Sequence, residues 1–117
     1  MRILLAEDKE ELSEGMALLL AGDGHFVEQA RDGVEALVKL RAASYDLLLT
    51  DLSMPRMNGT ALAAAARELD LKMPIIMLTG FAAMLLQDGE QPAGVNLLIG
   101  KPITHQKLAA AIARLAA

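Results

Sequence analysis

The sequence predicts an α/β fold in which a parallel sheet carries helices on both faces. Short apolar runs bounded by turn residues are typical of buried parallel strands, and segments with helical spacing separate these runs. Strand–helix alternation repeats five times along the chain, which implies a parallel sheet covered on both faces. The four buried strands are expected at residues 2–6, 46–50, from Pro74 onward, and 95–99.

A helix of about residues 9–21 follows the first strand. Its apolar side chains recur at helical spacing, and we expect them to face the sheet: Leu12, Met16, Leu19 and Leu20. Gly22-Asp23-Gly24 stops this helix. Residues 26–30 alternate between apolar and polar side chains, which indicates an edge strand.

Asp32-Gly33 opens a second helix, which runs to about Ala43. Its inward side chains are expected to be Val34, Leu37, Val38 and Leu40. A third helix begins at Gly59 or Thr60 and ends near Leu69.

The C-terminal part predicts two more helices. Residues 82–93 favour one or two turns of helix, which the segment Asp88-Gly89-Glu90-Gln91-Pro92 interrupts. Thr104 caps the final helix, and its apolar face consists of Leu108, Ile112 and Leu115.

Length and composition indicate one globular domain that spans residues 1–117. The hydrophobic fraction of 54% is too high for a disordered chain, and no apolar run is long enough to cross a bilayer. Met1 lies directly before the first strand, so we expect no signal peptide and a stand-alone or N-terminal placement. The last helix is expected to end with the chain, which leaves no room for an output domain.

Charge and residue usage exclude several classes of function. The net charge of −4 and the 3% aromatic content argue against direct nucleic-acid binding, which needs a basic patch. Cysteine is absent, which excludes disulfides, thiolate metal sites and cysteine nucleophiles, and agrees with a cytoplasmic location. Neither histidine has an acidic or histidine partner at ligand spacing, so we assign no role to them.

Polar side chains follow the four buried strands where each strand ends: Glu7, Asp8, Asp51, Thr79 and Lys101. The carboxyl ends of parallel strands meet at one edge of the sheet, where ligands gather. Three carboxylates close together repel one another, and Mg²⁺ suits such a set because it prefers carboxylates, waters and phosphate oxygens. A carboxylate can also attack a phosphoryl group. The plain alternatives are a turn-capping role for Asp51 and helix capping by Glu7-Asp8.

The whole chain resembles the receiver domain of two-component response regulators. The resemblance rests on four stretches in this order: Leu4-Leu5-Ala6-Glu7-Asp8, Leu49-Thr50-Asp51-Leu52-Ser53-Met54-Pro55-Arg56-Met57-Asn58-Gly59, Leu78-Thr79-Gly80 and Lys101-Pro102. It implies a flavodoxin-like, doubly wound, five-stranded parallel sheet of order 2-1-3-4-5.

The resemblance also implies a role for each site residue. Asp51 is the phosphoacceptor, Asp8 and Asp51 ligate Mg²⁺ directly, Glu7 acts through a water, and the Ser53 carbonyl is a further ligand. Lys101 pairs with Asp51 and then with a phosphoryl oxygen, and receivers hold the Lys101–Pro102 bond in cis.

Thr79 is expected to donate its hydroxyl to the phosphoryl group. Three features depart from the family pattern. Leu98 replaces the usual aromatic residue, Phe81 replaces a polar one, and the last helix is rich in alanine and poor in the charged pairs through which receivers dimerise. We therefore expect the output change to involve Thr79 and residues 81–94 rather than an aromatic switch at Leu98.

The resemblance implies a phosphoacceptor module that catalyses its own aspartyl phosphorylation and dephosphorylation. A histidine kinase or a histidine phosphotransfer protein is the expected donor, and the output protein is unknown. The alternatives are the receiver module of a hybrid histidine kinase and a phosphate-independent pseudo-receiver. A phosphatase using Asp51 is disfavoured because Ser53 stands where a second catalytic acid would be needed.

Overall fold

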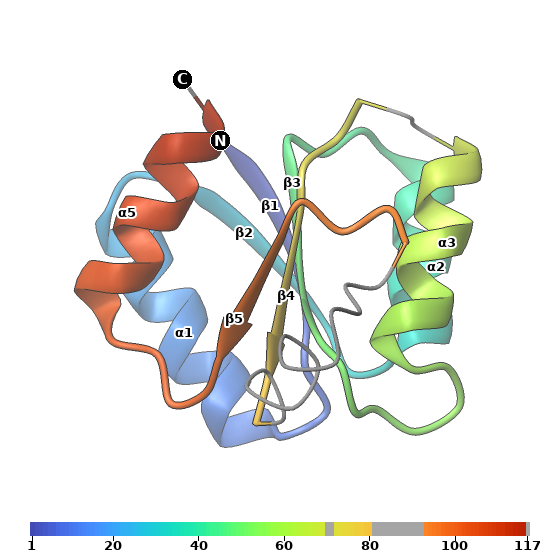
Figure 1. Cartoon of the computed structure of the whole chain (residues 1–117), viewed down its shortest axis with the longest axis horizontal. Helices are drawn as coiled ribbons and strands as arrows, with labels where there is room; N and C mark the ends of the chain where they lie inside the picture. Colours follow the sequence, from blue (N-terminus) through green and yellow to red (C-terminus); the bar gives the residue numbers. More distant parts are fainter. Residues whose placement is uncertain (70–71, 81–92, 117) are drawn as a thin grey trace.

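The computed structural model describes residues 1–69, 72–80 and 93–116 of the chain (Figure 1). Five parallel strands form one sheet in the order β2-β1-β3-β4-β5, which confirms the expected topology. The strands are β1 (Arg2–Ala6), β2 (Phe26–Ala30), β3 (Leu47–Asp51), β4 (Ile75–Thr79) and β5 (Leu97–Gly100). The helices in the described ranges are α1 (Glu10–Gly22), α2 (Gly33–Ala42), α3 (Gly59–Leu69) and α5 (His105–Ala116).

Helices cover both faces of the sheet. Figure 1 shows α1 and α5 on one face and α2 and α3 on the other. Side chains along a strand point alternately to the two faces, so the two faces build separate apolar cores. Leu4 and Leu48 belong to the core under α2 and α3, whereas Ile3, Leu5 and Leu49 belong to the core under α1 and α5.

The central strands β3 and β4 are buried along their whole length. Both end in a polar residue, Asp51 and Thr79, and these residues are also buried. A buried polar group is tolerated only where it has partners, so these strand ends mark the part of the sheet built for something other than packing.

Side-chain caps start three of the four described helices. Asp32 accepts a hydrogen bond from the Glu35 amide of α2 at 2.8 Å, Thr104 from Lys107 of α5 at 3.1 Å, and Asn58 from Ala61 of α3 at 2.9 Å. At α1 the capping residue is Lys9, and its side chain makes no capping bond. The expectation that Glu7-Asp8 could cap this helix is therefore wrong.

Helices α1 and α2 turn only part of their expected apolar faces inward: Leu20 is fully buried, and Met16, Leu37 and Leu40 pack against the two cores. Leu12 and Leu19 are 47% and 44% exposed, and Val38 is 60% exposed, so placing these three side chains inward was wrong. The buried residues of α1 are Ser13, Ala17 and Leu20, and of these only Leu20 was expected to face the sheet. The Ser13 hydroxyl donates to the side-chain oxygen of Gln29 in β2 at 2.9 Å, and this polar contact brings a hydroxyl inward that hydropathy places outside.

The expectations for Phe81 and for a short helix after residue 82 lie outside the described residues. In the part of the chain that is described, no helix combines the length and the apolar character needed to cross a membrane.

Candidate functional site

The carboxyl ends of β1, β3, β4 and β5 bring the predicted residues to one edge of the sheet. Asp51 pairs in register with Leu78, and Thr79 follows directly and pairs with Gly100. The chain leaves β1 through Glu7 and Asp8 and leaves β5 through Lys101. The parallel topology therefore gathers residues from positions 7 to 101 of the sequence.

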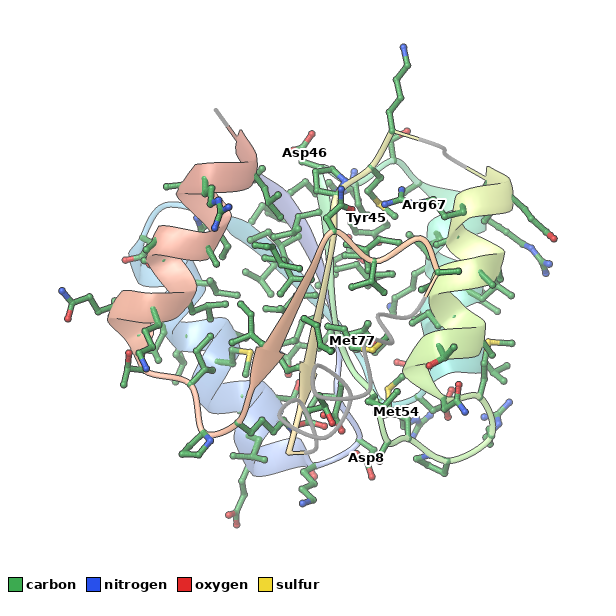
Figure 2. All side chains as sticks on the ribbon, viewed as in Figure 1. Asp8, Tyr45, Asp46, Met54, Arg67 and Met77 are labelled. Carbon is green, nitrogen blue, oxygen red and sulfur yellow. The ribbon has the colours of Figure 1, made fainter. Side chains whose placement is uncertain are left out.

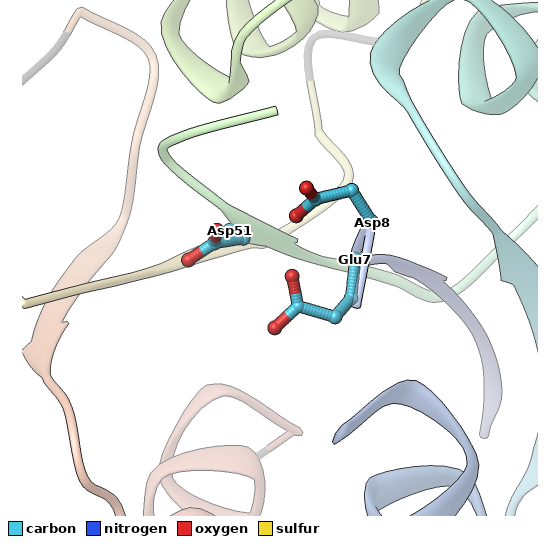
Figure 3. A group of neighbouring side chains, drawn as sticks. All are labelled: Glu7, Asp8 and Asp51. Carbon is cyan, nitrogen blue, oxygen red and sulfur yellow. The ribbon is translucent and has the colours of Figure 1, made fainter. Parts of the chain in front are cut away.

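Glu7, Asp8 and Asp51 form a group of three carboxylates (Figure 3). One oxygen from each lies within 4.8 Å of the others. Glu7 is 3% exposed and Asp51 is 8% exposed, whereas Asp8 is open to solvent. The group is thus buried on one side and accessible from the other.

Lys101 supplies the positive charge of the site. Its ammonium nitrogen lies 2.8 Å from Asp51 Oδ1 and 3.1 Å from Glu7 Oε1. Its backbone amide donates to the Thr79 carbonyl at 2.9 Å, so the end of β4 helps to place it. The Lys101–Pro102 bond is cis, as expected.

The positive charge of Lys101 does not balance the negative charge of the three carboxyl groups at the site. Burial raises the pKa of Glu7; the hydrogen bond from Lys101 opposes this shift, and the charge of Asp51 adds to it. Burial lowers the pKa of Lys101, but its hydrogen bonds to Asp51 and Glu7 outweigh burial and raise that pKa above its ordinary value. One ammonium therefore faces three carboxyl groups, two of them buried.

Glu7 Oε2 is the clearest sign of unused binding capacity. It is buried and has no hydrogen-bond partner in the described part of the protein. Leaving such an oxygen without a partner costs about 1–3 kcal/mol. Three carboxylates with an orphaned oxygen among them fit a hard divalent cation that prefers oxygen ligands, and Mg²⁺ is such a cation.

Ser53 and Asn58 lie beside this group rather than within it. Together with Asp8, Leu52 and Met54 they line an open depression of about 590 Å³. Ser53 itself is exposed. Helix α3 begins so close to the site that a Cβ on Gly59 would overlap the carbonyl oxygen of Asp51, so only glycine fits there.

Comparison with known proteins decides the family. The profile of the response regulator receiver domain matches residues 3–113. The chain belongs to the response regulator receiver family. It is thus a receiver domain of two-component signalling, and its sheet order is the one that the family resemblance implied.

Relatives of this receiver occur both as short proteins and as parts of long ones. The chain is 38% identical to the response regulator receiver protein CpdR of Brucella abortus and covers 82% of it, with 83% of this chain aligned. It is 35% identical to the sensor protein EvgS of Escherichia coli, but spans only 10% of that protein, with 85% of this chain aligned. Among solved structures, the chemotaxis response regulator CheY4 of Vibrio cholerae matches with a TM-score of 0.89 at 28% identity, covering 97% of both chains.

Two contacts at the site were missed by sequence reasoning. One is the bond between Lys101 and Glu7, which joins residues 94 positions apart. The other is an ion pair between Arg56 and Asp32, at 3.3 Å. Asp32 was recognised as a helix start, but no sequence spacing identifies a partner from another loop.

The sequence interpretation found no partner for His105 at ligand spacing and assigned it no role; in the structure His105 is exposed, and its partner lies far away in the sequence. Its Nε2 lies 2.7 Å from Asp23 Oδ2, which links the start of α5 to the end of α1. The two residues are 82 positions apart, and only the tertiary fold brings them together.

Proposed function

We propose that this receiver accepts a phosphoryl group on Asp51 from a histidine kinase or a histidine phosphotransfer protein, with Mg²⁺ bound. One observation carries the proposal. The Lys101 ammonium contacts both Asp51 and Glu7, while Asp8 completes a carboxylate group with an orphaned oxygen. That arrangement combines a nucleophile, a cation site and a fixed positive charge within one cluster.

In the proposed transfer, a carboxylate oxygen of Asp51 attacks the phosphorus of the donor phosphohistidine. A phosphorus–oxygen bond forms while the phosphorus–nitrogen bond breaks, and the imidazole nitrogen keeps the bonding electron pair. Lys101 is held at 2.8 Å from Asp51 and is placed to pair with a phosphoryl oxygen after transfer. The Thr79 hydroxyl donates to another phosphoryl oxygen.

Asp8, Asp51 and the Ser53 carbonyl would hold the Mg²⁺, and Glu7 would act through a water. Mg²⁺ held by these residues would supply positive charge to offset the negative charge that gathers when a phosphoryl group meets three carboxylates. Hydrolysis of the aspartyl-phosphate by water then restores Asp51 and releases phosphate. The phosphorylated and free forms present different surfaces to an output protein, and this switching is part of the proposal.

The domain works in the cytoplasm in this proposal, either alone or inside a longer chain. The receiver module of a hybrid histidine kinase is the second candidate, and a 35% identical match to hybrid signal transduction histidine kinase D of Dictyostelium discoideum favours it. Both candidates share the chemistry at Asp51 and differ in the source of the phosphoryl group. A phosphate-independent interaction module is disfavoured by the intact set of acids and the placed lysine.

Incubation with acetyl phosphate and Mg²⁺ tests the proposal. Intact-mass measurement should show the addition of one phosphoryl group, and Asp51→Asn should abolish it. Asp46→Asn is the matched control, because Asp46 lies at the opposite end of the sheet (Figure 2) and should leave labelling unchanged. Equal labelling of the Asp51→Asn variant would show that another residue is the acceptor.

A further inference from the structure

The loop that carries Ser53 joins β3 to α3, and its two ends are fixed by backbone contacts. We call residues 52–58 the β3–α3 loop. At one end, the Leu52 amide donates to the Leu78 carbonyl of β4 at 3.0 Å. At the other end, the Gly59 amide donates to the Leu52 carbonyl at 2.9 Å, and Asn58 caps α3. These contacts close the loop, but they leave residues 53–57 to be held in another way.

One ion pair holds the middle of the loop. Arg56 Nη1 lies 3.3 Å from Asp32 Oδ2, and this is the single polar contact from residues 53–57 to the rest of the described chain. The Asp32 side chain is 4% exposed, and its other oxygen accepts the Glu35 amide of α2. A buried carboxylate therefore uses one oxygen to start α2 and the other to hold the β3–α3 loop.

A close backbone contact lies beside this ion pair. A Cβ on Gly33 would overlap the carbonyl oxygen of Met57, so the loop rests directly on the first residue of α2. Arg56 itself has a φ of 67°, in the left-handed region that glycine occupies far more readily than other residues. The chain keeps a conformationally unfavourable arginine at the one position from which the loop contacts Asp32.

We propose that Asp32 and Arg56 are positioning residues that fix the β3–α3 loop and thereby hold the Ser53 carbonyl in place for Mg²⁺. The inference rests on the proposed function, because the position of Ser53 matters only at a site that binds the ion. Ser53 lies three residues before Arg56 and lines the same depression as Asp8. Groups that orient a metal ligand without touching the metal commonly change metal affinity.

The competing interpretation is an ordinary surface ion pair. Arg56 is 61% exposed, and exposed ion pairs contribute little to stability. The two interpretations predict opposite signs for Mg²⁺ binding. Removal of a positive charge near the acids should strengthen cation binding by simple electrostatics, whereas release of the loop should weaken it.

The variant Arg56→Gly separates these effects. It removes the guanidinium and also the unfavourable left-handed φ, so the melting temperature without metal should stay the same or rise. The dissociation constant for Mg²⁺, measured by calorimetric titration, should increase roughly tenfold, which is the low end of the range for groups that orient a metal ligand. Amide hydrogen exchange without metal should be faster in residues 53–57.

Arg31→Ala is the matched control. Arg31 is an exposed arginine that pairs with Glu35 at 2.9 Å and lines a pocket with Glu7 and Asp8. Its loss removes the same charge close to the acids without touching the β3–α3 loop, so Mg²⁺ should bind equally or slightly more tightly. Arg56→Lys keeps the charge and should recover most of the affinity lost in Arg56→Gly.

The outcomes distinguish this inference from the proposed function. Mg²⁺ binding by Arg56→Gly that is as tight as wild type, with unchanged exchange in residues 53–57, would overturn the positioning role and leave the proposed function standing. A wild-type protein that neither binds Mg²⁺ nor takes a phosphoryl group would overturn both. Weaker Mg²⁺ binding together with faster exchange, in a variant of undiminished stability, supports the positioning pair.

Discussion

The two ends of the sheet shift the pKa values of two glutamates in opposite directions, that of Glu7 upward and that of Glu28 downward. At the carboxyl end, burial raises the pKa of Glu7 and one of its oxygens has no partner. Toward the amino end, a hydrogen bond from Arg2 and another from Tyr45 lower the pKa of Glu28. Figure 2 shows the separation, with Asp8 at one end of the strands and Tyr45 and Asp46 at the other.

The amino-end group consists of Arg2, Glu28, Tyr45 and Asp46. Arg2 bonds to Glu28 at 2.9 Å, Tyr45 donates to Glu28 at 2.8 Å, and Asp46 accepts the Arg2 amide at 2.7 Å. Although Arg2 Nε has no hydrogen-bond partner in the described residues, the guanidinium lies over the rings of Tyr45 and Phe26, at 5.0 and 5.5 Å. In this group, the acids find their partners within the protein itself.

The contrast between these two groups of acids indicates that one end of the sheet contributes to stability and the other is suited to ligand binding. Carboxylates that are fully paired inside the protein stabilise the fold and offer nothing to a ligand. Carboxylates that outnumber their partners destabilise the metal-free protein and are ready to bind a cation or a phosphoryl group. Substitutions at the amino end should therefore lower stability, whereas removal of an acid at the carboxyl end should raise it.

The largest stability effect is expected for Arg67→Met. Arg67 lies near the amino end of β4 (Figure 2) and donates to the carbonyl oxygens of Met73 and Gly94 and to Asn96 Oδ1. Loss of these bonds should lower the free energy of unfolding by about 2 kcal/mol, measured by urea denaturation. Arg41→Met removes an exposed arginine with no hydrogen bond or ion pair in the described ranges, so it is the control. A change in Arg67→Met no larger than in this control would contradict the assignment of stability to the amino end.

A smaller effect of opposite sign is expected for Glu7→Gln without metal. The folded-state pKa of Glu7 is raised above its ordinary value of 4.5. The wild type therefore loses stability as the pH rises from 4.5 through the folded-state pKa of Glu7. The variant avoids this loss, so its free energy of unfolding at pH 7 should be higher than that of wild type, and the difference should fade in acid. Denaturation at several pH values measures it, with the exposed Glu68→Gln as control. A variant less stable than wild type at pH 7 would show that Lys101 already compensates Glu7 fully.

The smallest effect is expected for Glu28→Gln. The folded-state pKa of Glu28 is lowered, so its stabilising contribution is present above the ordinary value of 4.5 and is lost as pH falls through the folded-state pKa. The melting temperature of the variant should be slightly below that of wild type at pH 7 and equal to it in strong acid. A variant that is more stable than wild type at pH 7 would remove the contrast with Glu7.

Local sequence signals predicted the sheet and the gathering of the candidate site residues at one of its edges. Each strand is a short apolar run, and each of Asp51, Thr79 and Lys101 follows or ends one, so strand position alone brings them to one edge. Local sequence patterns predicted the helix caps Asp32 and Thr104. The cap Asn58 was seen only in the structure. Such caps act within one turn of chain, which is why sequence can reveal them.

The features that sequence reasoning missed depend on tertiary contacts. Hydropathy placed Leu12 inward, but Leu12 is exposed and the neighbouring Ser13 is buried, with its hydroxyl bonded to Gln29. The pairing of Arg56 with Asp32 and of Lys101 with Glu7 joins separate loops, and no local pattern encodes either pair.

The contact between Lys101 and Glu7 makes the site a late product of folding. It closes a span of 94 residues, whereas the bond between Arg2 and Glu28 closes a span of 26. Contacts of such long range form only after the intervening strands have assembled, because loop closure has an entropic cost that local contacts cannot offset. The contacts of Lys101 with Glu7 and Asp51 cannot form before residue 101 has been made, whereas the residues of the amino-end group all lie within the first 46. The cluster of Glu7, Asp51 and Lys101 is therefore complete only once β5, the strand that Lys101 follows, has joined the sheet.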